Sequence, residues 1–181
     1  IYDFYIKSNE SVFPKNYYDL SEQDKFEVLS NVKGALNPDD FENEITRLTI
    51  ESIQAIKVIQ GNNGELGANR YIISNNENAL NVMETFALIR LSDWENPTVD
   101  VVPLFESVDD LLNAHNVMEQ LYTNPVYANH LVNREMKQTI MLGFSDGTKD
   151  GGYLMANWSI YKAKEELTRI SKEYGIEVVF F

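Results

Sequence analysis

The sequence predicts an α/β protein in which about four parallel strands form part of a (β/α)8 barrel, preceded by an N-terminal helical segment. Residues 1–67 carry helix-start signals and no strand-like run, whereas residues 68–181 alternate short apolar runs, rich in β-branched residues, with helical segments. Successive runs begin about 30 to 40 residues apart, the spacing of βαβ units. A doubly wound open sheet shows the same alternation, so periodicity leaves both architectures open.

The first segment contains start signals for two helices. Ser21 caps a helix that we expect to end near Gly34, and Asn37 with Pro38 begins a second helix that ends at Gly61. Apolar residues of this second helix recur at helical spacing and predict one packing stripe: Phe41, Ile45, Leu48, Ile56 and Ile59, together with Ser52. The stretch 61–67 is rich in glycine and asparagine, as loops are, and divides the chain into a helical segment, 1–67, and half a barrel, 68–181.

The second segment contains four candidate strands with helices between them. Because crossovers between parallel strands of one sheet are right-handed, we expect the strands to be adjacent and parallel, with the helices outside. Functional residues are then expected at the carboxyl ends of the strands. The expected strands are 71–74, 99–105, 139–144 and 176–181, and the expected helices are 79–91, 108–121, 125–135 and 153–174.

Composition argues against several classes of function. The 15 Lys and Arg residues against 28 Asp and Glu give a formal charge of −13, the wrong sign for binding nucleic acid. The absence of cysteine excludes disulfides, thiolate zinc sites and cysteine nucleophiles. No run approaches the roughly 20 apolar residues of a membrane span, and Ile1–Lys7 lacks the features of a signal peptide. We therefore expect a soluble, cytoplasmic protein that binds no membrane.

Both ends of the sequence have the character of cuts. Ile1 is not a natural start, and Phe181 closes an apolar run with no turn or polar tail after it. We therefore expect the chain to be an internal piece of a longer protein.

Glu106 is the first candidate for chemistry, because it directly follows the apolar run that ends in Phe105. A carboxylate at the carboxyl end of a strand can bind a hard cation. Ser107 with Asp110 also fits a capping pair for the next helix, which would make Glu106 a solvated loop residue. Taken alone, Glu106 fits this second explanation better.

The second candidate is the segment 144–152, which holds two carboxylates, a lysine and three glycines. This composition suits phosphate or metal binding, although a polar turn with Ser145 or Asp150 as an N-cap explains it about equally well. The order Gly-Lys-Ser/Thr is missing, so the segment is not a P-loop. Because Glu106 and Asp146 end neighbouring strands, we expect them to converge on one Mg²⁺ or Mn²⁺ ion. Lys149 could then reach an anion held by the metal, or it could be an ordinary surface lysine.

The remaining conspicuous residues fit structural roles. His115 and His130 lie in expected helices without a partner at metal-ligand spacing. An apolar stripe on the last helix is expected to pack against the sheet; it consists of Leu154, Trp158, Tyr161, Leu167, Ile170 and Tyr174.

Several of these runs, in this order and spacing, resemble the middle of the phosphoenolpyruvate carboxylase family. They are Tyr71–Ser74, Val102–Glu106, Phe144–Gly151, and Trp158 with Tyr161–Leu167. The likeness covers most of 71–181, and 1–67 looks like a helical insertion between barrel strands. The usual Tyr-Ser-Asp-Ser of the family is Phe-Ser-Asp-Gly at 144–147.

The resemblance implies a TIM-like barrel in a carboxy-lyase that forms oxaloacetate and phosphate from phosphoenolpyruvate and bicarbonate, feeding the tricarboxylic acid cycle. It assigns the divalent cation, Mg²⁺ or Mn²⁺, to Glu106 and Asp146, and it places Lys149 near bicarbonate. It also implies a homotetrameric parent enzyme. Phosphate-binding, histidine and arginine residues of the family site would lie before Ile1 and after Phe181, so we expect the isolated chain to be inactive. Another Mg²⁺-dependent barrel lyase acting on pyruvate or phosphoenolpyruvate, and a non-catalytic interaction domain, remain alternatives.

Overall fold

The computed structural model describes residues 13–181, so the Ile1–Lys7 segment, which argued against a signal peptide, lies outside the described residues. The chain divides into two compact units. The first contains Ile1–Asn69 and Met83–Thr98, and the second contains Arg70–Val82 and Val99–Phe181. The boundary after Asn69 falls beside the expected one at residue 67, but the segment Met83–Thr98 belongs to the first unit.

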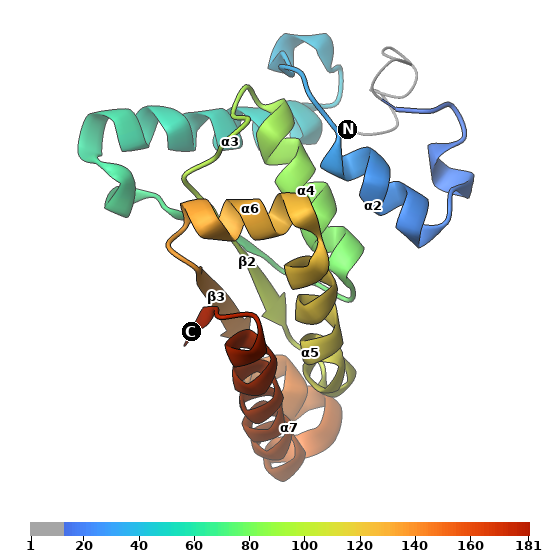
Figure 1. The fold of residues 1–181 in the computed structure, drawn as a ribbon, viewed down its shortest axis with the longest axis vertical. Coiled ribbons are helices and arrows are strands. Elements are labelled where there is room, and N and C mark those ends of the chain that lie inside the picture. Colours follow the sequence, from blue (N-terminus) through green and yellow to red (C-terminus); the bar gives the residue numbers. More distant parts are fainter. Residues whose placement is uncertain (1–12) are drawn as a thin grey trace. The chain divides into compact units, whose positions relative to one another are not determined.

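The first unit is helical in the part that the structure describes (Figure 1). Local capping explains its helix starts, because the side chains of Ser21, Asn37 and Asn43 each accept a backbone N–H of the turn that follows. Gly64, with φ of 83°, ends α3, the longest helix of this unit, in the left-handed region that glycine tolerates. The elements are η1 (Tyr17–Asp19), α2 (Glu22–Ser30), η2 (Pro38–Asp40), α3 (Glu44–Asn63) and η3 (Glu65–Gly67), with most of α4 (Ala79–Leu91).

The predicted packing stripe of the second helix is wrong. Pro38 begins only a 3-10 turn, and α3 starts at Glu44, so Phe41 lies outside the helix. Ile45 is 77% exposed and Leu48 53% exposed, whereas the buried residues of α3 are Ile50 and Ile53. Because α3 carries apolar residues on more than one face, periodicity could not select the face that is buried.

The second unit contains one four-stranded parallel sheet in the order β1-β2-β3-β4, as predicted. Each strand lies beside the one before it, without the reversal that a doubly wound sheet requires, so the sheet winds as part of a (β/α) barrel does. The central strands are the more buried ones. The strands are β1 (Arg70–Ile73), β2 (Asp100–Phe105), β3 (Lys137–Leu142) and β4 (Glu177–Phe180).

The helices α5 (Val108–Thr123) and α6 (Pro125–Asn133) follow the predicted segments, whereas α7 (Ser145–Glu173) begins before the expected start at residue 153. α5 and α7 lie side by side in Figure 1, and Tyr122 Oη and Ser171 Oγ share a buried 3.1 Å hydrogen bond between them. Within residues 13–181, no helix combines the length and apolar character needed to cross a bilayer.

A buried polar network joins β2 and β3 at their amino ends, opposite the expected functional edge. Backbone pairing between these strands is limited to Leu104 with Met141 and Phe105 with Leu142. Nearer the amino ends of the strands, the side-chain NH₂ of Gln138 donates to the Val101 carbonyl at 3.1 Å. The side-chain oxygen of Gln138 accepts from the Tyr127 hydroxyl at 2.9 Å. The Arg134 guanidinium donates to Asp100 at 2.6 Å. Side chains thus supply the polar contacts between the strands where the ladder is missing.

Candidate functional site

Glu106 lies in the short connection between β2 and α5, and its carboxylate has a defined orientation. Oε2 accepts the backbone N–H of Asn75 at 3.0 Å. Asn75 follows β1 and has φ of 53°, a left-handed conformation that asparagine tolerates better than most residues. A turn after β1 therefore fixes a carboxylate after β2, and Glu106 is not a freely solvated loop residue. The sequence pointed to the end of β1 but gave no signal for this bond.

The connection after β3 differs from the predicted loop, because residues 145–151 are helical and form the first part of α7. Phe144 occupies the N-cap position, and the Thr148 hydroxyl donates to its carbonyl at 2.8 Å. Gly152, with φ of 81°, interrupts the helix before its long second part. Neither Ser145 nor Asp150 is the N-cap of α7, so that part of the alternative explanation is wrong.

Two glycines allow the connections after β2 and β3 to touch. The Gly143 N–H donates to the Phe105 carbonyl at 2.8 Å, and a Cβ on Gly143 would lie 3.1 Å from the Glu106 Cα. A Cβ on Gly147 would lie 3.4 Å from the Glu106 carbonyl oxygen. Since β2 and β3 are parallel neighbours, Glu106 and the turn that carries Asp146 share the carboxyl end of the sheet.

Lys149 binds the carboxylate of Asp146 within this turn, with Nζ and Oδ1 2.6 Å apart. This hydrogen bond, together with the charge of Asp146, raises the pKa of Lys149, and the charge of Glu106 adds to the effect. The ammonium group therefore lies in the field of both carboxylates. Both side chains of the pair are largely exposed, so solvent screens the interaction.

The donor set suits a hard divalent cation that completes its coordination with water and substrate. Mg²⁺ commonly binds proteins through one or two carboxylates plus phosphate oxygens, and Glu106 with Asp146 offers two carboxylates at one edge. Among residues 13–181, no group of three or more His, Cys, Asp or Glu side chains could hold a metal ion. Glu106 and Asp146 would therefore be the two carboxylates available to a cation at this edge, with its other ligands coming from water or substrate.

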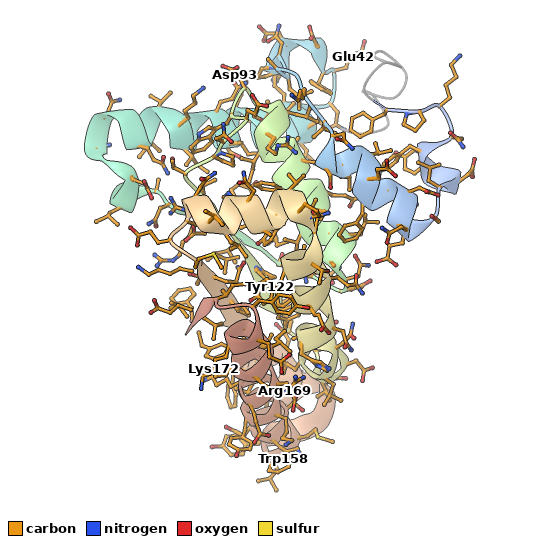
Figure 2. The ribbon with its side chains drawn as sticks, viewed as in Figure 1. Glu42, Asp93, Tyr122, Trp158, Arg169 and Lys172 are labelled. Atoms are coloured by element: carbon orange, nitrogen blue, oxygen red, sulfur yellow. The ribbon has the colours of Figure 1, made fainter. Side chains whose placement is uncertain are left out.

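Other predicted features lie outside this site. His130 is 5% exposed on α6, and burial, with the charge of Arg134, lowers its pKa to about 4. Leu167 and Ile170 are buried as predicted, but Leu154 is 82% and Trp158, labelled in Figure 2, is 58% exposed. The predicted stripe is therefore wrong over residues 154–161 of α7. The buried residues between 154 and 163 are small ones: Ala156, Ser159 and Ala163.

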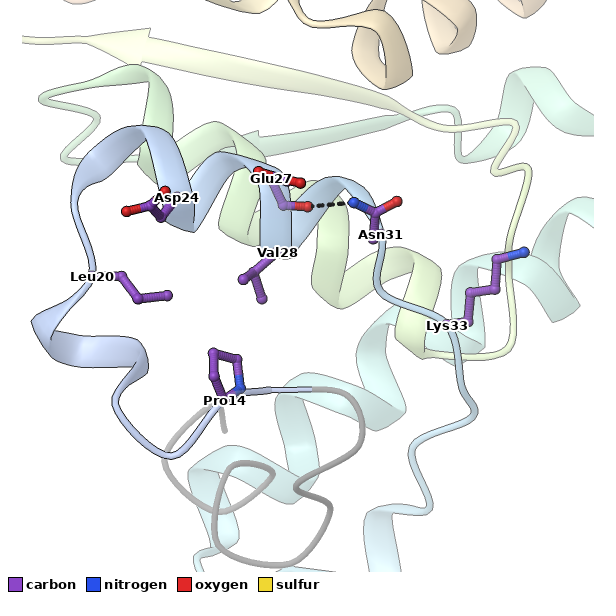
Figure 3. A pocket seen from close by; sticks show the side chains of 7 residues that line it. All are labelled: Pro14, Leu20, Asp24, Glu27, Val28, Asn31 and Lys33. Carbon is purple, nitrogen blue, oxygen red and sulfur yellow. Dashed lines mark hydrogen bonds between the residues drawn. The ribbon is translucent and has the colours of Figure 1, made fainter.

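A hollow in the first unit, of about 670 Å³, contains none of these residues (Figure 3). Its lining mixes acidic, basic and apolar side chains and so indicates no particular class of ligand. Asp24 and Glu27 line it together with Lys33, Leu20 and Val28. Asn31 donates to the backbone carbonyl of Glu27, so its amide serves the end of α2. We therefore base the functional assignment on the edge of the sheet and not on this hollow.

A four-stranded parallel sheet wound in sequence, with Glu106 and Asp146 placed after neighbouring strands, has the architecture of part of a (β/α) barrel. Comparison with known proteins defines the family. The family model for phosphoenolpyruvate carboxylase matches residues 6–181. The chain belongs to the phosphoenolpyruvate carboxylase family, as its sequence motifs predicted.

Curated relatives include the phosphoenolpyruvate carboxylases of Nitrosomonas europaea and Nitrosomonas eutropha. Each is 32% identical over 178 residues, covering 92% of this chain and 19% of the relative. The chain thus spans about a fifth of the length of the relatives it matches.

Proposed function

We propose that this chain is the part of a phosphoenolpyruvate carboxylase that binds the divalent cation, with Glu106 and Asp146 as its protein ligands. The observation that carries the proposal is the contact between the two connections, in which Gly143 and Gly147 lie against Glu106. Membership of the family adds the reaction, the formation of oxaloacetate and phosphate from phosphoenolpyruvate and bicarbonate. The cation is Mg²⁺ or Mn²⁺, and it supplies Lewis-acid stabilisation of phosphate and enolate charge.

The residues of this chain have separate tasks in the proposed reaction. The Asn75 N–H holds one oxygen of Glu106 and leaves the other free to face the cation. Lys149 binds Asp146 when no anion is present, and its long side chain can turn to bicarbonate or to the phosphorylated bicarbonate that forms from it. A positive group at this place offsets charge that grows during phosphoryl transfer.

In the complete enzyme, we propose that the sheet continues into a closed TIM-like barrel, with residues 1–67 as a helical insertion. Further strands would supply the groups that bind the phosphate of the substrate. We further propose a cytoplasmic homotetramer. The isolated chain then lacks part of the catalytic constellation and is expected to be inactive.

The test compares this chain with the complete enzyme and with its Glu106→Gln and Asp146→Asn variants. Oxaloacetate formation from phosphoenolpyruvate, bicarbonate and Mg²⁺ is followed by coupling to malate dehydrogenase. Each substitution keeps size but removes the charge of a ligand, so we expect losses on the order of 10²–10³ in rate. Variants with near wild-type rates would show that these carboxylates are bystanders. Turnover by the isolated chain would refute the proposal that its active site is incomplete. An inactive complete protein would favour a non-catalytic interaction domain.

A further inference from the structure

Asp150 links the turn that carries Asp146 to the start of α5. Its Oδ2 accepts the backbone N–H of Val108 at 3.2 Å. Val108 is the first residue of α5 and lies two positions after Glu106. The bond therefore joins the two connections that contribute the proposed metal ligands.

The capping box at the N-terminus of α5 does not use the Val108 N–H, which has no acceptor within the helix, and Asp150 supplies that acceptor from another element. Ser107 and Asp110 form a reciprocal capping box, with the Asp110 N–H bound to Ser107 Oγ at 3.1 Å and the Ser107 N–H bound to Asp110 Oδ2 at 3.0 Å. Asp150 comes from a different element, 42 residues along the chain. What the bond adds is a fixed distance between α5 and the turn.

The backbone of Gly151, the residue after Asp150, packs closely against Val108. A Cβ on Gly151 would lie 3.0 Å from Cγ2 of Val108 and 2.9 Å from Cγ of Met155. The next residue, Gly152, has φ of 81° and separates the turn from the rest of α7. The turn 145–151 is thus bounded by Gly143 and Gly152, and it touches the other connection at Glu106 and at Val108.

Helix geometry relates this contact to the proposed metal ligand. Asp146 and Asp150 are four residues apart in a helical turn, so their side chains lie on the same face. If Asp150 faces Val108, that face is turned toward the connection that carries Glu106. Without the bond, the left-handed glycine would be a natural pivot for the turn.

We propose that Asp150 is a positioning residue: by binding the Val108 amide, it holds the turn that carries Asp146 and Lys149 against the segment that carries Glu106. This inference rests on the proposed function, in which Glu106 and Asp146 bind the cation. Removal of an outer partner of a metal ligand typically weakens metal binding 10- to 100-fold. An effect at the lower end of that range is expected here, since the bond acts through the backbone of the turn.

The experiment measures Mn²⁺ binding to the full chain by electron paramagnetic resonance of the free ion, and amide hydrogen exchange of Val108 and residues 145–151. Asp150→Ala removes the acceptor, while Asp150→Asn keeps a carbonyl oxygen without the charge. Asp109→Ala is the matched control, because Asp109 is an exposed aspartate next to Val108 and its substitution removes the same charge as Asp150→Ala. We expect Asp150→Ala to weaken Mn²⁺ binding about tenfold and to speed exchange in the turn. Asp150→Asn and Asp109→Ala are expected to stay within about twofold of wild type.

Equal Mn²⁺ affinity and equal exchange in Asp150→Ala and Asp109→Ala would overturn the proposal. A different result would refute the proposed function: equal Mn²⁺ binding by wild type and by the Glu106→Gln and Asp146→Asn variants. In that case the exchange of the turn alone decides whether Asp150 holds it. Faster exchange in Asp150→Ala, reversed in Asp150→Asn, would support the positioning role without any metal.

Discussion

Acid is expected to destabilise the second unit through His130. This side chain is 5% exposed, and burial, followed by the charge of Arg134, lowers its pKa from the ordinary 6.5 to about 4. The unfolded chain therefore binds a proton at this histidine more tightly than the folded chain does. The sign follows from linkage: the contribution to stability is present above about pH 6.5 and is lost as the pH falls toward 4.

The size of the effect follows from the two pKa values. The difference between 6.5 and about 4, at 1.36 kcal/mol for each pH unit, corresponds to about 3 kcal/mol of stability over the whole window. Between pH 7 and pH 5, the same two values give about 2 kcal/mol. This narrower interval avoids most of the titration of ordinary carboxyl groups.

Urea unfolding at a series of pH values from 7 to 5 measures this contribution, with helical circular dichroism as the signal. The free energy of unfolding of wild type is expected to fall by about 2 kcal/mol over this interval. His130→Asn is expected to remove most of that fall, whatever its stability at pH 7. His115→Asn, which removes the other histidine of the chain, is the control and is expected to keep the fall.

Two outcomes would refute the reasoning. A His130→Asn variant with the same pH dependence as wild type would show that this side chain does not couple folding to protons. An NMR titration in which the His130 ring has its midpoint above pH 6 would show that burial does not lower its pKa.

Three further predictions concern stability. Asp100→Ala is expected to lower the free energy of unfolding by about 3 kcal/mol, because it leaves the Arg134 guanidinium, 12% exposed, without its carboxylate at 2.6 Å; a change below about 0.5 kcal/mol in urea unfolding would contradict this. Gly61→Ala, where a Cβ meets nothing within 4 Å, is expected to stabilise α3 by about 0.5–1 kcal/mol. Gly64→Ala, at φ of 83°, is expected to destabilise it by about 1 kcal/mol; shifts of the same sign in calorimetry would refute this pair. Asn76→Ala is expected to cost no stability or to raise it by about 1 kcal/mol, because both polar atoms of this 1% exposed amide have no hydrogen-bond partner within residues 13–181; a clear drop in melting temperature would contradict it.

The sequence alone determined the local elements and their order in the sheet. β-branched runs followed by helical periodicity placed β1 to β4 and α4 to α6 within a few residues. The capping pair at Ser107 and Asp110 marked the start of α5, because the interaction involves residues three positions apart. The shared edge of Glu106 and Asp146 was also predictable, since the carboxyl ends of adjacent parallel strands meet.

Only the tertiary structure decided which apolar faces are buried and how the site is held. α3 and residues 153–167 of α7 each carry apolar side chains on more than one face. Which face is buried depends on what packs against it, and the periodicity of one helix does not contain that information. The bonds from Asn75 to Glu106 and from Val108 to Asp150 join residues 31 and 42 positions apart. Such contacts form because strand pairing brings together loops that are far apart in the sequence. Local sequence patterns describe each loop separately and do not show which loops will meet.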